Sequence, residues 1–164
     1  MLKNGLFLGF MILVGLIAAC EKPEVYDENA QYVIDEAIIK KWADSTKTEL
    51  TKHPSGLYYL IIRPGIGTEI VSTYDTLTVN HTTKIFKKDS VISSATDTTG
   101  YKFILETGIP GWKNGLPLIK QGGRIRLIIP SNQAYKNYVI GNIPKNTILD
   151  CTIDLRKVVK DRLK

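Results

Sequence analysis

Residues 101–135 read YKFILETGIPGWKNGLPLIKQGGRIRLIIPSNQAY, and they determine how the rest of the chain is interpreted. Ile109-Pro110-Gly111-Trp112 precedes a strand-like run at 124–129, and Ala134-Tyr135 follows that run. Folded together, these residues would form an apolar cup with an indole at its floor and a phenol at its edge. Such a cup holds no nucleophile and no metal ligand, so the sequence predicts a site that binds rather than one that attacks.

The segments around this stretch have the period of two that is typical of half-buried strands. Apolar residues alternate with polar ones at 76–81 and at 149–156. Five strands are predicted, at 57–63, 76–81, 101–105, 124–129 and 149–156. Clean alternation favours an antiparallel sheet, and a short helix would open at Pro110 and be cut by Pro117. The predicted class is therefore α+β, a curved antiparallel sheet of about five strands wrapped on a short helix.

The order of several short motifs resembles the FKBP family of peptidyl-prolyl cis-trans isomerases, the macrolide-binding immunophilins. Besides the residues already quoted, the resemblance rests on Ser55-Gly56-Leu57-Tyr58-Tyr59, Pro64-Gly65-Ile66-Gly67, Gln121-Gly122-Gly123 and Ile143-Pro144. It implies an FKBP-like domain over residues 55–164 that acts on proline-containing peptides without any cofactor or metal.

The resemblance also implies a role for each pocket residue. Trp112 would form the floor under the prolyl ring, while the backbone N–H of Ile109 and the hydroxyl of Tyr135 would hold substrate carbonyls. The walls would be formed by Tyr101, Phe103 and Ile143. The simpler alternative is that Trp112 and Phe103 are ordinary core aromatics and that Ile143 only leads into a strand.

The sequence departs from the family at four pocket positions. The family's pocket tyrosine falls on His81, the aromatic of its last strand on Cys151, and a valine on Gly108. Its Phe-Asp-Ser-Ser run falls on Val91-Ile92-Ser93-Ser94 or on Ile92-Ser93-Ser94-Ala95, and neither alignment keeps the carboxylate. The changes at 108 and 151 would enlarge the cup, so tight macrolide binding is not expected.

Two of these residues have competing interpretations. His81 would hydrogen-bond the substrate in place of the tyrosine, with a pH-dependent response, or it is a half-buried histidine bonded to a neighbour. Cys151 would line the enlarged cup, and it is more simply a small apolar filler than a reactive thiol.

Residues 1–19 have the layout of a bacterial lipoprotein signal peptide, with Lys3, an apolar run at 6–17 and small residues before Cys20. The pattern Ile17-Ala18-Ala19-Cys20 resembles a lipobox, in which the cysteine is lipidated and becomes the mature N-terminus. The alternatives are an ordinary signal peptide and a membrane helix, although 5–20 is shorter than the roughly 20 residues that span a bilayer. We therefore expect a domain anchored by lipid at Cys20 in the bacterial envelope, at the outer membrane.

A tether at 20–31 and a helical extension at 32–54 are predicted to precede the domain. The tether is acidic and contains Pro23. In the extension, Ile34, Ile38 and Trp42 recur every four positions, which indicates an amphipathic helix. Its apolar stripe would pack on the domain or, alternatively, bind a partner protein.

Composition excludes little beyond disorder. The formal charge is +6, but lysines and arginines are scattered among acidic residues, so nucleic-acid binding is not expected. Two His and two Cys are too few for the usual zinc sites. The alternatives to an isomerase are a catalytically weak or inactive module that binds envelope proteins, and a structural lipoprotein of an outer-membrane or gliding machinery.

Overall fold

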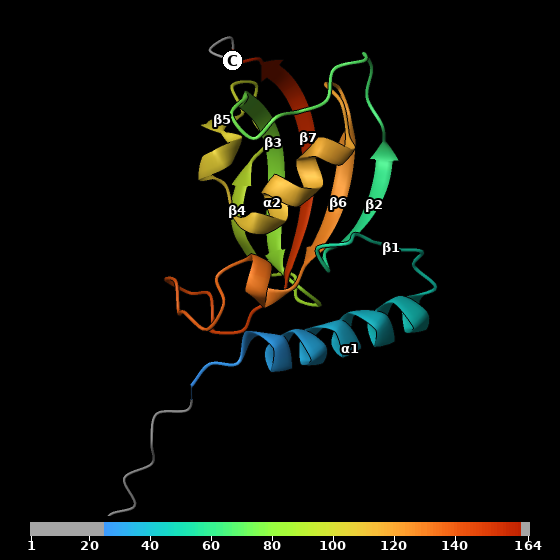
Figure 1. Cartoon of the computed structure of the whole chain (residues 1–164), viewed down its shortest axis with the longest axis vertical. Helices are drawn as coiled ribbons and strands as arrows, with labels where there is room; N and C mark the ends of the chain where they lie inside the picture. Colours follow the sequence, from blue (N-terminus) through green and yellow to red (C-terminus); the bar gives the residue numbers. More distant parts are fainter. Residues whose placement is uncertain (1–24, 162–164) are drawn as a thin grey trace, which may run out of the picture.

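A computed structural model describes residues 25–161 of the 164-residue chain. The predicted signal peptide, the lipidated Cys20 and most of the predicted tether lie outside the described residues. The chain folds as a curved antiparallel sheet with the short helix α2 (Pro110–Gly115) against one face and the long helix α1 (Glu28–Thr46) across one end (Figure 1). The predicted α+β class is confirmed.

The sheet has seven strands, of which five were predicted. They are β1 (Thr51–Lys52), β2 (Tyr58–Arg63), β3 (Thr76–Ile85), β4 (Val91–Ala95), β5 (Tyr101–Ile104), β6 (Arg124–Ile129) and β7 (Leu149–Val159). Their spatial order is β1-β2-β6-β7-β3-β4, and β5 pairs with the same edge of β3 as β4 does. All pairs are antiparallel, and β1 and β4 are the two strands that the sequence did not predict.

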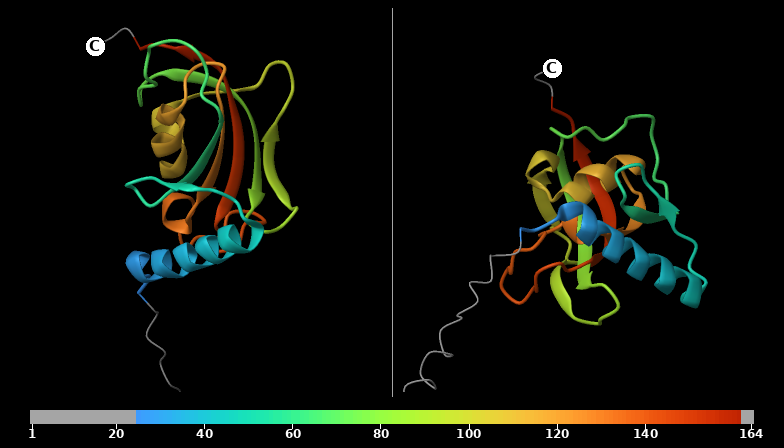
Figure 2. Two further views of the ribbon diagram at one scale, coloured as in Figure 1. Left: turned by 90° about the vertical axis from the view of Figure 1, so that its right-hand side faces the viewer. Right: turned by 60° about the horizontal axis from the view of Figure 1, so that its bottom comes forward.

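Alternation along the central strands builds the core. Leu77, Val79 and His81 of β3 are buried, and every second residue of β7 from Leu149 to Leu155 is fully buried. These side chains share a cluster or a ring contact with Trp112 of α2. Helix α2 lies within the concave side of the sheet (Figure 2). The main hydrophobic core therefore lies between the sheet and the helix that carries Trp112.

Helix α2 lies close to β6 because two of its residues lack side chains. A Cβ atom on Gly111 would collide with the side chain of Ile129, and one on Gly115 would come within 2.6 Å of Leu127. Pro110 occupies the first helical turn, as predicted, because its fixed φ suits that position. After Gly115 the chain tightens into a 3₁₀ turn at Leu116–Leu118, which contains the predicted interruption at Pro117.

Helix α1 packs on the domain, as predicted, through Ile39 and Trp42 of its apolar side, but the centre of the buried face is shifted away from Ile34 and Ile38. Its fully buried residues are Asp35 and Ile39, whereas Val33, Ile34 and Ile38 are 65%, 54% and 39% exposed. Ile39 enters a second buried cluster with Tyr58, Phe86, Ile128 and Ile148, against which Trp42 also packs. The helix begins at Glu28, inside the segment that we predicted to be a tether.

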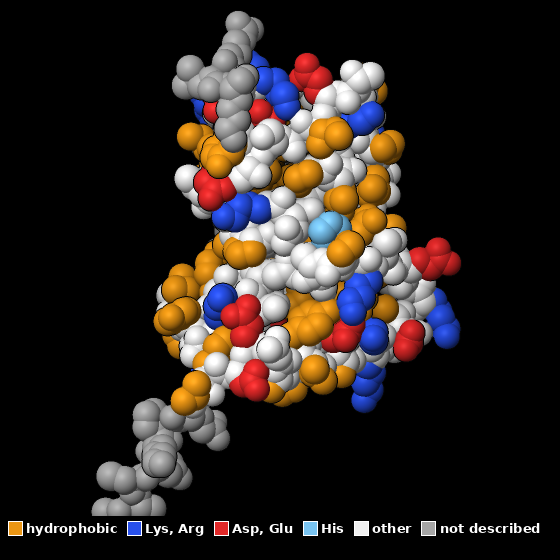
Figure 3. Space-filling model, in the orientation of Figure 1, with side chains coloured by type: hydrophobic (Ala, Val, Ile, Leu, Met, Phe, Trp, Pro, Cys, Tyr) orange, Lys and Arg blue, Asp and Glu red, His pale blue; other side chains and the backbone are white. Residues whose placement is uncertain are grey.

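Charged residues of both signs are scattered among hydrophobic and uncharged polar side chains on the visible surface. On the face drawn in Figure 3, lysine and arginine side chains are interspersed with aspartate and glutamate. Within residues 25–161, no helix combines the length and apolar character needed to cross a bilayer.

Candidate active site

A cavity of about 490 Å³ lies between α2, the β3–β5 edge of the sheet and the loop after β6. Seven of the eight predicted pocket residues line it: His81, Tyr101, Phe103, Ile109, Trp112, Tyr135 and Ile143. They come from β3, β5, α2 and two loops, so the fold brings together residues that lie far apart in the sequence, from position 81 to position 143. The cavity is the concave, mostly apolar kind of site in which small ligands bind.

A cluster of aromatic rings lines the cavity. Trp112 is 8% exposed, and its ring centroid lies 5.4 Å from that of Phe103 and 5.1 Å from that of His81. Phe103 is stacked on Tyr101 at 5.1 Å, and Tyr101 is 47% exposed. Edge-to-face and offset contacts of this kind hold rings in fixed orientations, so the indole has a rigid upper surface.

Two hydrogen-bond donors at the rim remain unused. Among the described residues, the backbone N–H of Ile109 donates to no acceptor, although the Ile109 carbonyl accepts from Trp112 and Lys113 as α2 begins. The hydroxyl of Tyr135 likewise has no hydrogen-bond partner within residues 25–161. Burial raises the pKa of the Tyr135 hydroxyl, so this group stays protonated and able to donate near neutral pH.

His81 is paired within the cavity wall. Its Nε2 lies 3.0 Å from the Ser93 hydroxyl, while its buried Nδ1 has no partner among the described residues. Burial lowers the pKa of this imidazole, because the charged form would lose its hydration. The neutral ring therefore predominates near pH 7, and it donates to or accepts from Ser93 according to its tautomer.

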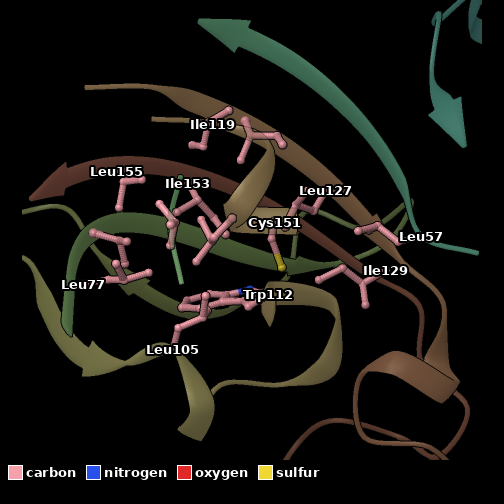
Figure 4. Close-up of a cluster of buried hydrophobic side chains, with 14 of the residues drawn as sticks. Leu57, Leu77, Leu105, Trp112, Ile119, Leu127, Ile129, Cys151, Ile153 and Leu155 are labelled. Carbon is pink, nitrogen blue, oxygen red and sulfur yellow. The ribbon is translucent and has the colours of Figure 1, made fainter. Parts of the chain in front are cut away.

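The structure corrects the expectation for Cys151. This residue is fully buried and does not line the cavity. Its sulfur points toward the indole of Trp112 from the sheet side, as Figure 4 shows, and accepts a hydrogen bond from Thr83 Oγ1 at 3.4 Å. Burial raises the pKa of the thiol to about 11, so Cys151 is an inert filler beneath the floor.

The cavity also has a polar side that the sequence motifs did not reveal. Ser93 and Ser94 of β4 and Thr107 line it together with the aromatic residues. In the sequence, Ser93 and Ser94 were signalled only by the two alternative alignments of 91–95, and Thr107 gave no signal. The structure pairs Ser93 with His81 at 3.0 Å. Within the described residues, no cluster of three or more His, Cys, Asp or Glu could hold a metal ion.

Comparison with known proteins agrees with this architecture. Residues 67–156 match the model of the FKBP-type peptidyl-prolyl cis-trans isomerase family, which covers the cavity and most of the sheet. The chain belongs to this FKBP family.

Two relatives support the assignment. The FKBP-type peptidyl-prolyl cis-trans isomerase FkpA of Buchnera aphidicola (Schizaphis graminum) is 38% identical over 112 residues, or 65% of this chain and 42% of that protein. FkpA of Escherichia coli K12 is 35% identical over 104 residues, which are 63% of this chain and 38% of that protein. The chain thus spans less than half the length of the relatives that it matches.

Solved structures show the same fold. The crystal structure of FkpA from Escherichia coli superposes with a TM-score of 0.68 at 29% identity, over 80% of this chain and 62% of that one. The predicted FKBP-like architecture is therefore confirmed. The folded unit extends N-terminal to the matched residues, because α1, β1 and β2 all pack on the rest of the domain.

Proposed function

We propose that this protein is a peptidyl-prolyl cis-trans isomerase that places the ring of a substrate proline on the indole of Trp112. The observation that supports this role best is a roomy apolar cavity with Trp112 at its base and the free N–H of Ile109 at its rim. In this arrangement Tyr101, Phe103 and Ile143 would surround the ring, and Ile109 and Tyr135 would hold carbonyls of the peptide.

The chemistry of the reaction suits such a site. Rotation about the peptide bond crosses a barrier of about 18–20 kcal/mol, which reflects lost amide resonance. No proton transfer or covalent intermediate is required. A twisted amide is less dipolar than a planar one, so a dry cavity that binds the twisted form more tightly lowers the barrier.

A direct test compares Trp112→Leu with wild type in an NMR exchange or protease-coupled assay on an X-Pro peptide. A chain that begins at Glu21 keeps every described residue. We expect wild type to accelerate isomerisation and Trp112→Leu to lower kcat/KM by about tenfold or more, because the indole face is lost. Trp42→Leu is the matched control, since Trp42 lies in α1 and does not line the cavity.

The test also separates catalysis from simple binding. The His81–Ser93 pair and the missing carboxylate favour, as a second candidate, a module that binds envelope proteins without catalysing their isomerisation. If the wild-type protein gives no acceleration over buffer but still binds proline-containing peptides through Trp112, this second candidate replaces the first. A structural lipoprotein would instead co-purify with a stable membrane complex.

We further propose that Cys20 carries the lipid that anchors the protein in the bacterial envelope, at the outer membrane. The support is the run Ile17-Ala18-Ala19-Cys20 after an apolar segment. Mass spectrometry of the mature N-terminal peptide should find acyl groups on Cys20. Replacing Cys20 by Ala should release the protein from the membrane fraction, and retention of that variant in membranes would contradict the anchor.

A further inference from the structure

A buried carboxylate joins the N-terminal helix to the chain that carries Tyr135. Asp35 of α1 is 1% exposed, and its Oδ2 accepts hydrogen bonds from the backbone N–H of Ser131 at 2.7 Å and from the Ser131 hydroxyl at 2.6 Å. Its Oδ1 accepts from Gln31 at 2.8 Å. A buried carboxylate is tolerated only when it is well hydrogen-bonded, and short bonds to a charged acceptor are the strong ones.

The segment that Asp35 holds is a compact turn with Tyr135 near its end. The carbonyl of Ser131 accepts from the N–H of Ala134 at 3.0 Å and from that of Lys136 at 2.8 Å. Lys136 in turn forms an ion pair with Glu28 of α1 at 3.0 Å. Helix α1 therefore contacts the turn on both sides of Tyr135.

The same turn is fixed to the helix that carries Trp112. Gln133 is 5% exposed, and its Oε1 accepts from Asn114 of α2 at 2.9 Å. Its Nε2 donates to the carbonyl of Ser55 at 2.9 Å, in the loop before β2. Hydrogen bonds from α1, from α2 and from this loop thus converge on residues 131–136.

Tyr135 depends on this backbone because its own hydroxyl bonds to no other described residue. The position of the hydroxyl at the cavity rim is therefore set by where the turn lies. Removing the Asp35 carboxylate would leave the N–H of Ser131 buried without an acceptor, so the turn would shift to find one. Small displacements of a positioning group are costly to catalysis.

We propose that Asp35 is a positioning residue of the active site, which holds the 131–136 turn so that the Tyr135 hydroxyl faces the substrate. The N-terminal helix is then part of the active-site scaffold, although it lies outside the matched family region. This inference rests on the proposed isomerase function, but the attachment of the turn to α1 has a readout of its own.

The first experiment is a double-mutant cycle in the full-length chain, held in lipid nanodiscs. Asp35→Ala, Tyr135→Phe and the combined variant are compared by kcat/KM at a temperature where all are folded. We expect Asp35→Ala to lower kcat/KM by about tenfold and to have little further effect when Tyr135 is already Phe. Asp35→Asn keeps an oxygen that can accept hydrogen bonds from Ser131, so this variant should retain most of the wild-type kcat/KM.

The control is Asp44→Ala, an exposed acidic residue on the same helix, which should leave kcat/KM unchanged. If Asp35→Ala only lowers the melting temperature and keeps wild-type kcat/KM, Asp35 is merely structural and the inference fails. Independent effects of Asp35→Ala and Tyr135→Phe would also overturn it, because Asp35 would then act by another route.

Hydrogen exchange distinguishes failure of this inference from failure of the proposed function. In Asp35→Ala, the amides of Ala134 and Lys136 should exchange about tenfold faster, because the turn that protects them is released. Unchanged exchange would refute the inference even in an active enzyme. Faster exchange in a protein without isomerase activity would leave the attachment of the turn in place and refute the function instead.

Discussion

At the scale of single residues, His81 lies where the sequence resemblance implies a pocket tyrosine. The imidazole is 6% exposed, its Nε2 contacts Ser93, and its ring packs edge-on against Trp112. This pairing agrees with the interpretation of His81 as a buried histidine bonded to a neighbour, and it also leaves the ring in the cavity wall. Protonation would put a charge into an apolar site, and burial lowers the pKa for that reason.

We expect this histidine to make folding stability pH-dependent. Its folded pKa is lower than the usual value of about 6.5, so the unfolded chain binds the proton more readily. The contribution of neutral His81 to the free energy of unfolding is therefore fully present above about pH 6.5, and it declines as the pH falls below that value. Urea unfolding of wild type should therefore show a lower midpoint at pH 5.5 than at pH 7.5.

The matched variant is His81→Tyr, which introduces the tyrosine that the resemblance implies at this position and does not titrate in this range. Its midpoint should change less between the two pH values. Equal pH dependence in the two proteins would mean that other groups cause the decline and that His81 binds its proton equally well folded and unfolded.

The contrast between Cys151 and Asp35 explains what could be predicted at this scale. Alternation in β7 correctly predicted that Cys151 faces inward. A period of two cannot predict whether an inward-facing residue lines the cavity or is covered by α2. Asp35 gave no signal, because an acidic residue in a helix is normally exposed and its partner Ser131 lies 96 positions away. Trp112, Tyr135 and Ile109 could be predicted to lie near one another because they belong to short motifs whose order resembles that of a known family, and all three line the cavity.

At the scale of elements, α1 shows why hydrophobic periodicity can misplace the centre of a buried face. Two overlapping stripes run along the helix and both include Trp42. One contains Ile34 and Ile38, and the other contains Asp35 and Ile39. The first is more apolar, yet the second is buried, because Ser131 and Gln31 satisfy the carboxylate. The guanidinium of Arg126, which is bound to Asp150, lies 5.1 Å from the centroid of the Trp42 ring.

Alanine substitutions on the two faces of α1 should differ in their cost. Ile39→Ala empties a fully buried site in the second cluster and should lower the free energy of unfolding by about 2–5 kcal/mol. Ile34→Ala, on the exposed face, should change it by no more than about 0.5 kcal/mol. Urea unfolding followed by circular dichroism measures both values, and equal costs would contradict this docking of the helix.

At the scale of the whole molecule, the predicted division into an extension at 32–54 and a domain at 55–164 does not coincide with a gap in packing. Ile39 is buried together with Tyr58, Phe86, Ile128 and Ile148, so one cluster joins both parts. The Asp35–Ser131 hydrogen bonds join them again beside the cavity. The sequence suggested a boundary because the helical pattern ends at His53-Pro54-Ser55-Gly56 and a period of two follows, but periodicity is a local property and packing is not.

The two tryptophans allow this unity to be measured, because one lies in each part: Trp42 in α1 and Trp112 in α2. In single-tryptophan variants made with Trp112→Phe and Trp42→Phe, fluorescence reports each part separately during urea unfolding. Each fluorescence curve should coincide with the circular dichroism curve of the same variant, because α1 cannot leave without exposing Ile39 and stranding Asp35. If the Trp42 signal changes at a lower urea concentration than the circular dichroism of the sheet, α1 unfolds as a separate unit. The helix would then be dispensable to the scaffold, and its hold on the Tyr135 turn would be too weak to position a catalytic group.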